Sequence, residues 1–229
     1  MKLLFFIFAV VVFSFSLNNI SINMPKNKRS YLALGDSYTI GEAVESNKNF
    51  PHQLVEILKQ KGFDFAEPEI IAKTGWTTDE LQVAILKHEL HPPYDLVTLL
   101  IGVNNQYRGR SAEEYSAEFE SLLKQAIQFA GEKNDHVIVL SIPDWGVTPY
   151  AEGRDRKKIA EEIDEFNRVN QMISKNYGVH YLDITPGTRE AENDHSFLTT
   201  DGLHPSAKEY KRWAEKIADL ITKNSYSGN

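Results

Sequence analysis

The chain has 229 residues, with 25 Lys and Arg against 32 Asp and Glu, and its formal net charge is −7. This acidic balance argues against general nucleic-acid binding, which needs clustered positive charge. The chain contains no cysteine, which excludes disulfides, thiolate nucleophiles, cysteine-based metal sites and the lipid-modified cysteine of a bacterial lipoprotein. The length suits one domain with a sizeable core. Composition therefore excludes several classes of protein but identifies no substrate.

The first 17 residues differ from the rest of the chain. Lys2 precedes an apolar run that ends at Phe13, and Ser14 and Ser16 then occupy positions −3 and −1 of a cleavage site. This pattern is typical of a secretory signal peptide, and the run is shorter than the roughly 20 residues of a spanning helix. We expect residues 1–17 to be a signal peptide and the protein to be exported, periplasmic or extracellular. An uncleaved anchor or a buried first helix is the alternative.

The remainder divides into a linker over residues 18–29, a domain over 30–224 and a polar tail over 225–229. Within the domain, short apolar runs alternate with longer helical patterns. The runs have the length and residue types of strands that are buried on both faces. They are Tyr31–Leu34, Glu69–Ala72, Leu96–Ile101, His136–Ile142 and Val179–Ile184.

The helical patterns carry start signals. Thr77 precedes Glu80, and Ser111 precedes Glu114, by the spacing of a capping box. Further helices are expected over Pro51–Gln60, from about Asp155 to Asn176, and from Pro205, since proline is tolerated in a first helical turn. Five strands alternating with five helices predict an α/β fold, with a parallel sheet covered by helices on both faces. The reactive site of such a sheet lies beyond the carboxyl ends of its strands.

The loop after the first strand presents a serine. Ser37 follows Gly35 and Asp36 at the strand end. The segment lacks the lysine of a phosphate-binding P-loop, and Thr39 replaces the last glycine of a nucleophile elbow. Ser37 is therefore either a nucleophile on a tight turn or a helix cap.

Two further loops supply candidate hydrogen-bond donors. Gly75 follows the second strand and could turn a backbone N–H toward a ligand, or simply form a turn. Asn104 follows the third strand, where its carboxamide could stabilise developing negative charge, or form a local turn.

The last loop supplies a histidine with a nearby carboxylate. Asp201 stands three residues before His204, and a general base needs such a partner to hold one tautomer. Asp194 and His195 are a rival pair, although their surroundings indicate an ordinary polar loop. The other histidines fit helix or strand interiors or a solvated helix end: His52, His88, His91, His136 and His180.

Together these blocks resemble the GDSL/SGNH hydrolase family of esterases, which is named for Ser, Gly, Asn and His in four separate blocks. Gly35-Asp36-Ser37, Gly75, Gly102-Val103-Asn104-Asn105 and Asp201-Gly202-Leu203-His204-Pro205 occur in that order, each after a predicted strand. Tyr38 stands where the family name has leucine, a departure that we expect to affect the shape of the pocket rather than the reaction.

The resemblance implies a flavodoxin-like three-layer α/β/α fold with a five-stranded parallel sheet and hydrolysis of carboxylic esters. It implies that Ser37 is the nucleophile, His204 the general base and then acid, and Asp201 its orienting partner. An oxyanion hole would consist of the Ser37 and Gly75 backbone N–H groups and the Asn104 side chain. No metal or cofactor is implied.

The substrate is less defined. Aromatic residues follow the strands at Trp76, Tyr107, Trp145, Tyr150 and Phe197, where they could stack on sugars, line an acyl tunnel or pack helices on the sheet. We expect short-acyl or carbohydrate O-acetyl esters. The alternatives are a lysophospholipase or long-chain acyl hydrolase, an acyltransferase to a sugar, and a non-catalytic carbohydrate-binding domain. The sequence carries no signal for an oligomer. The helix near Arg154–Arg168 is rich in both charge signs, which predicts that its charged face is exposed to solvent.

Overall fold

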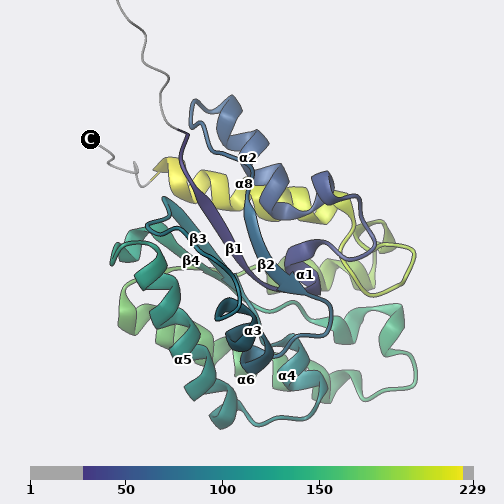
Figure 1. The fold of residues 1–229 in the computed structure, drawn as a ribbon. Coiled ribbons are helices and arrows are strands. Elements are labelled where there is room, and N and C mark those ends of the chain that lie inside the picture. The colour runs from purple at the N-terminus through teal and green to yellow at the C-terminus, as the bar shows by residue number, and fades with distance from the viewer. Residues whose placement is uncertain (1–27, 224–229) are drawn as a thin grey trace, which may run out of the picture.

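A computed structural model of the chain describes residues 28–223 (Figure 1). Five parallel strands form one sheet in the order β2-β1-β3-β4-β5, which confirms the predicted α/β architecture. The strands are β1 (Tyr31–Asp36), β2 (Glu69–Lys73), β3 (Leu96–Leu100), β4 (Val137–Leu140) and β5 (His180–Leu182). The predicted signal peptide, residues 18–27 of the predicted linker and the polar tail lie outside the described residues. None of the helices described is long and apolar enough to cross a bilayer.

Helices cover both faces of the sheet. Helices α2 (Phe50–Gln60) and α8 (Ala207–Lys223) pack together on one face, and α3 (Thr78–Ile85), α5 (Ala112–Phe129) and α6 (Arg156–Tyr177) cover the other (Figure 1). The sequence of α8 shows why it lies flat, since its apolar residues recur at helical spacing along one stripe. That stripe is fully buried and consists of Tyr210, Trp213, Ala214, Ile217, Ala218 and Ile221.

Of the two predicted capping boxes, the one at Thr77 is complete and the one at Ser111 forms only in part. The Thr77 N–H donates to the Glu80 carboxylate at 3.0 Å, as the predicted capping box requires. Ser111 accepts from the Glu114 N–H at 3.1 Å, but the Glu114 carboxylate lies 3.5 Å from Arg110 instead of returning to the cap. A nearby cation therefore competes with the second half of the box.

The last helix begins at Ala207 instead of the predicted Pro205. Pro205 forms an isolated antiparallel bridge with Leu198, and the Ser206 N–H donates to the Phe197 carbonyl at 2.7 Å. These two contacts keep the chain extended for two more residues before the helix can start.

The fourth strand is also shorter than the predicted range His136–Ile142. His136 ends a 3₁₀ turn over Asn134–His136, and the Ile142 N–H donates to the Asn167 side chain at 2.8 Å rather than to a neighbouring strand. The fifth strand is shorter than the predicted range Val179–Ile184 by the same amount, and all strand boundaries agree with the prediction to within two residues.

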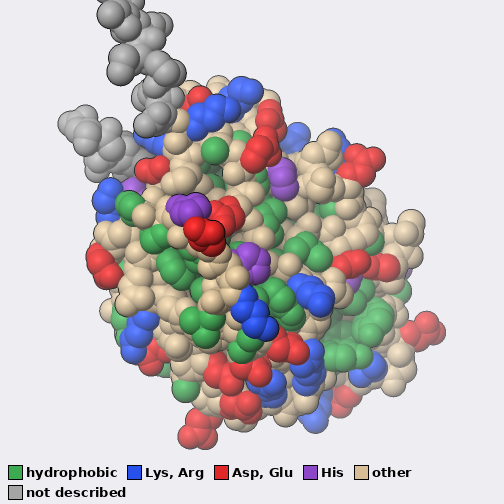
Figure 2. All heavy atoms as spheres, viewed as in Figure 1, with side chains coloured by type: hydrophobic (Ala, Val, Ile, Leu, Met, Phe, Trp, Pro, Cys, Tyr) green, Lys and Arg blue, Asp and Glu red, His purple; other side chains and the backbone are tan. Residues whose placement is uncertain are grey.

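The pairing register brings several loops to one edge of the sheet. Asp36, at the end of β1, pairs with Lys73 at the end of β2, and Gly35 pairs with Leu100 at the end of β3. Because all five strands are parallel, the loops that follow β1, β2 and β3 leave the sheet side by side. On the face in Figure 2, acidic and basic side chains are interspersed.

Candidate active site

Ser37 follows the carboxyl end of β1, the strand between β2 and β3, where β1 turns directly into the short helix α1 (Ser37–Ile40). A Cβ on Gly35 would lie 2.5 Å from the Leu100 carbonyl oxygen, so only glycine allows this close approach. Asp36 caps the helix, because its carboxylate accepts the Tyr38 N–H at 3.0 Å. The turn leaves Ser37 only 4% exposed.

Gly75 lies in a tight turn that follows β2. The Trp76 N–H donates to the Lys73 carbonyl at 3.2 Å, and Gly75 has φ +83°, as expected for the third residue of a type II turn. The Arg108 guanidinium donates to the Gly75 carbonyl at 2.6 Å and lies 3.2 Å from Glu80. Arg108 thus fixes the turn from the neighbouring loop.

Gly102 begins the loop that follows β3. Its φ is +131°, and a Cβ at this position would lie 2.6 Å from the ring of the buried Tyr115. The glycine therefore meets both a backbone and a packing requirement. It allows the chain to enter the helix α4 (Val103–Tyr107) immediately after the strand.

Asn104 lies in the first turn of α4 and links the three loops. Its amide nitrogen donates to the Trp76 carbonyl at 3.0 Å and to the Asp36 carboxyl at 3.3 Å. Burial raises the pKa of Asp36 to about 7, although the bonds from the Tyr38 N–H and the Asn104 amide favour its anion. The oxygen of a neutral or partly charged carboxyl is a weaker acceptor for Asn104 than a fully ionised one.

His204 and Asp201 form a hydrogen-bonded pair in the loop before α8. The Asp201 Oδ2 and the His204 Nδ1 are 2.7 Å apart. The other carboxylate oxygen, Oδ1, accepts the backbone N–H groups of Leu203 (2.9 Å) and His204 (3.0 Å) and the Thr199 hydroxyl (2.6 Å). Burial raises the pKa of Asp201, but these hydrogen bonds outweigh it and lower the pKa to about 2. Asp201 is therefore an anion whose orientation is fixed.

The three strand-end loops and the His204 loop enclose a cleft of about 180 Å³. Ser37 and His204 both line it, but within residues 28–223 no hydrogen bond joins the Ser37 hydroxyl to the imidazole. Such bonds often form or tighten only when substrate binds. The cleft is lined by Ser37, Tyr38, Thr74, Gly75, Val103, Asn104, Tyr107, Trp145, Tyr150, Leu203 and His204.

The sequence profile of the GDSL-like lipase/acylhydrolase family matches residues 33–212. The chain belongs to this family. It is therefore a carboxylic ester hydrolase of the GDSL/SGNH serine type, as the four sequence blocks predict. Comparison with curated protein sequences finds no match.

Solved structures of similar fold include other members of this GDSL-like family. A lipase/acylhydrolase from Enterococcus faecalis is 22% identical, with a TM-score of 0.65 over 86% of this chain and 96% of that one. An acetylxylan esterase from Geobacillus stearothermophilus is 18% identical, with a TM-score of 0.65 over 84% and 94%. A psychrotrophic esterase from Pseudoalteromonas sp. is 16% identical, with a TM-score of 0.62 over 86% and 98%. At these identities the similarity establishes the shared fold.

Within this GDSL-like domain, the residues expected at the site meet in space. Ser37, Gly75, Asn104 and His204 line the cleft, and Asp201 lies behind His204. Their catalytic roles stay predictions. The rival residue Asp194 instead accepts the Ser196 N–H at 2.9 Å and lies 3.2 Å from Lys208.

The aromatic residues separate into two groups. Tyr107, Trp145 and Tyr150 line the cleft. Trp76 packs against the core beside the Gly75 turn, and Phe197 is buried outside the cleft. The expectation of an aromatic site therefore holds for three of the five rings.

Two residues that shape the site were not assigned a role from sequence. Arg108, which holds the Gly75 turn, follows a five-residue helix that is too short to show a period. Asp36 was noted only as part of the first block, and its bond to Asn104 joins loops 68 residues apart. Its place at the end of an apolar strand, between Gly35 and Ser37, is the one local signal that the sequence offers.

Proposed function

We propose that this chain hydrolyses short-acyl esters through an acyl-enzyme on Ser37. The observation that carries the proposal is the His204–Asp201 pair, 2.7 Å apart, whose histidine lines the same cleft as Ser37, Gly75 and Asn104. A serine becomes an effective nucleophile when an oriented imidazole can take its proton.

The first step is proton transfer and attack. Asp201 is an anion, so it accepts a hydrogen bond from His204 Nδ1–H and leaves Nε2 as the acceptor for the Ser37 proton. The Ser37 Oγ attacks the ester carbonyl carbon, and the carbonyl oxygen becomes an oxyanion. His204 then gives the proton to the leaving alcohol oxygen, and the acyl group stays on Ser37. Water activated by His204 releases the acid in the second half of the reaction.

The oxyanion would be stabilised by the Ser37 and Gly75 backbone N–H groups and the Asn104 amide. In the free protein the Asn104 amide already has two acceptors, at 3.0 Å and 3.3 Å. The longer bond, to Asp36, is the weaker one, and we infer that it yields when the oxyanion forms. The raised pKa of Asp36 helps this exchange, because a protonated carboxyl competes less for the amide.

The size and rim of the cleft support acetyl and other short-acyl esters of a carbohydrate. The space beside Ser37 is about 180 Å³, and the rim carries Tyr107 and Tyr150, which are 41% and 45% exposed. Their hydroxyls lie 3.2 Å apart, and Arg154 donates to Tyr107 at 3.2 Å. Partly exposed rings with polar edges suit a sugar, which has an apolar face and peripheral hydroxyls.

The test compares kcat/KM for p-nitrophenyl acetate, butyrate, octanoate and palmitate, followed by acetate release from an acetylated glycan. We expect the highest values for acetate or butyrate. Faster cleavage of octanoate and palmitate would instead favour the long-chain or lysophospholipid alternative. An added sugar acceptor distinguishes transfer from hydrolysis, because a transferase would yield acylated sugar in place of free acid.

Ser37→Ala should remove turnover while the protein stays folded, and Ser121→Ala, on the exposed side of α5, is the matched control. A fluorophosphonate should label the wild type at Ser37 and leave Ser37→Ala unlabelled. Wild-type turnover by Ser37→Ala would refute the mechanism. An unlabelled, inactive wild type would instead favour the non-catalytic binding domain.

We also propose that the protein is exported through its apolar N-terminus. N-terminal sequencing of protein recovered outside the cytosol should give a chain that starts at Leu17. A cytosolic chain that starts at Met1 would contradict this proposal.

A further inference from the structure

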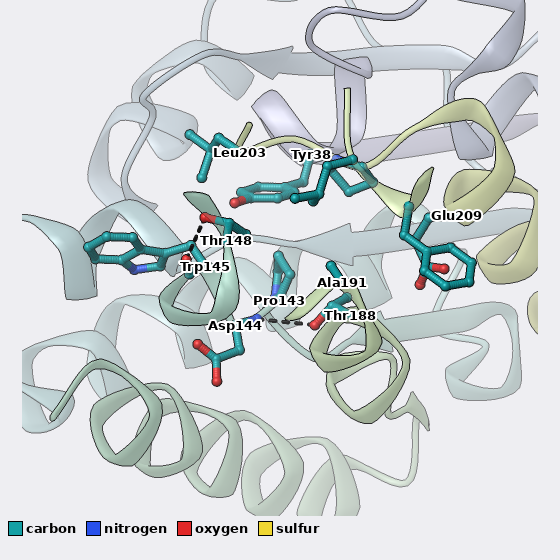
Figure 3. A pocket seen from close by; sticks show the side chains of 12 residues that line it. Tyr38, Pro143, Asp144, Trp145, Thr148, Thr188, Ala191, Leu203 and Glu209 are labelled. Carbon is teal, nitrogen blue, oxygen red and sulfur yellow. Dashed lines mark hydrogen bonds between the residues drawn. The ribbon is translucent and has the colours of Figure 1, made fainter. Parts of the chain in front are cut away.

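A second, much smaller cavity adjoins the cleft, and Figure 3 shows the side chains that line it. Its volume is about 20 Å³, enough for about one water molecule or methyl group. Tyr38, Trp145 and Leu203 line both this cavity and the cleft, so these three side chains form the partition between them. The cavity is also lined by Pro143, Asp144, Thr148, Thr188, Ala191, Phe197, Leu198, Pro205 and Glu209.

The carboxylate and threonine side chains around the cavity already have partners. The Asp144 carboxylate points away from Tyr38 in Figure 3 and lies 2.9 Å from Arg189. Glu209 accepts the indole N–H of Trp213 at 2.7 Å, and Thr148 donates to the Trp145 carbonyl at 2.7 Å. The remaining lining is mostly apolar, so the cavity is better suited to hydrocarbon than to a polar group.

Tyr38 is the part of the partition nearest in the chain to the serine. Its backbone N–H is held by Asp36 at 3.0 Å, and its ring centroid lies 5.2 Å from that of His204. Its side chain is buried, and Figure 3 shows the ring between Leu203 on one side and Thr148 on the other. Because the ring is buried and packed between these side chains, it cannot leave the partition without repacking.

We propose that Tyr38 is a specificity-determining residue that limits the acyl group to a short chain. The inference rests on the proposed function, in which the acyl group is bonded to Ser37 Oγ. Tyr38 lines both the cleft that holds Ser37 and the apolar cavity, so its ring separates an acyl group on Ser37 from that cavity. A smaller residue at position 38 joins the cavity to the cleft and opens a longer apolar channel.

The size of the effect follows from apolar burial. Each additional methylene that is transferred from water to an apolar site corresponds to about a four-fold gain in kcat/KM. Two methylenes accommodated in the joined space therefore correspond to about a 15-fold gain. We expect the ratio of kcat/KM for p-nitrophenyl hexanoate to that for butyrate to rise by about this factor in Tyr38→Ala, and by less in Tyr38→Leu.

The experiment measures kcat/KM over p-nitrophenyl esters from acetyl to octanoyl for wild type, Tyr38→Phe, Tyr38→Leu and Tyr38→Ala. Tyr38→Phe keeps the ring and should keep the wild-type profile. Phe119→Leu, in the core between α5 and its neighbours, controls for a general loosening of the fold and should also keep that profile. Circular dichroism reports whether each variant is folded, and Tyr38→Leu carries the test if Tyr38→Ala does not fold.

Unchanged chain-length profiles in the folded Tyr38→Leu and Tyr38→Ala variants would overturn the inference. Failure of the proposed function looks different, since the wild type itself would then prefer long acyl chains. A short-chain wild type with unresponsive Tyr38 variants refutes only the role of Tyr38.

Discussion

Replacing Asp201 by asparagine should inactivate the enzyme by reversing the tautomer of His204. The Asp201 Oδ1 accepts two backbone N–H groups and the Thr199 hydroxyl, so position Oδ1 must remain an acceptor. The asparagine oxygen will therefore occupy that position, and its NH₂ group will face His204 Nδ1 at the present 2.7 Å. Two donors cannot face each other, so Nδ1 must lose its proton and Nε2 must carry one.

A histidine protonated at Nε2 cannot accept the Ser37 proton. In a serine triad of unrelated fold, the same substitution lowers kcat about 10⁴-fold, which corresponds to about 5 kcal/mol of transition-state stabilisation. We expect a loss of this size in Asp201→Asn for p-nitrophenyl acetate. The ¹⁵N chemical shifts of labelled His204 should report an Nδ1–H imidazole in the wild type and an Nε2–H imidazole in the variant.

Asp194→Asn is the matched control. Asp194 also caps a short turn through its carboxylate and stands near the same helix, but it has no histidine partner in the cleft. It should keep activity within a few-fold of wild type. Activity of Asp201→Asn within ten-fold of wild type, or an unchanged His204 tautomer, would refute the assigned role of Asp201.

Three further predictions concern the strand-end loops. Asn104→Ala should lower kcat by about 10²–10³, as loss of one oxyanion donor does, with little change in KM; an effect on KM alone would contradict that role. Burial raises the pKa of Asp36 from 3.8 to about 7, so the folded chain binds more protons than the unfolded chain between these pH values and its stability falls as pH rises. The free energy of unfolding falls by up to about 4 kcal/mol over this range. Urea unfolding at pH 4 and pH 8 should show a smaller fall in this free energy for Asp36→Asn than for wild type; equal falls would contradict the raised pKa. Gly102→Ala should destabilise the fold by about 1–3 kcal/mol more than Gly109→Ala, because both have positive φ but only the first meets the Tyr115 ring, at 2.6 Å; thermal unfolding measures the difference, and equal losses would contradict the clash.

The parallel sheet, and the location of the site at the carboxyl ends of its strands, could be predicted from the sequence because their signals are local. The fully buried run of β1 and the capping box at Thr77 are each visible within a few residues. His204 and Asp201 were accessible for the same reason, since they stand in one loop, three residues apart.

The contacts that connect the loops could not be predicted in this way. The bond between Asn104 and Asp36 joins residues 68 positions apart, and the one between Arg108 and Gly75 joins residues 33 positions apart. Such pairings depend on the strand register, which periodicity does not encode. Tyr38 was recognised as a departure from the family pattern, but the cavity behind it is visible only in the packed structure.

The packing of α2 against α8 affects the geometry of the catalytic site, although neither helix lines the cleft. Asp201 and His204 are aligned within a single turn, so their mutual geometry needs no long-range contact. What the fold must deliver is the separation between that turn, which leads into α8, and the β1 end, which leads toward α2. The packing of these two helices, in which the ring centroids of Phe50 and Trp213 are 6.1 Å apart, therefore helps to set the distance between Ser37 and His204. Substitutions in this interface can therefore lower kcat although every residue that lines the cleft stays the same.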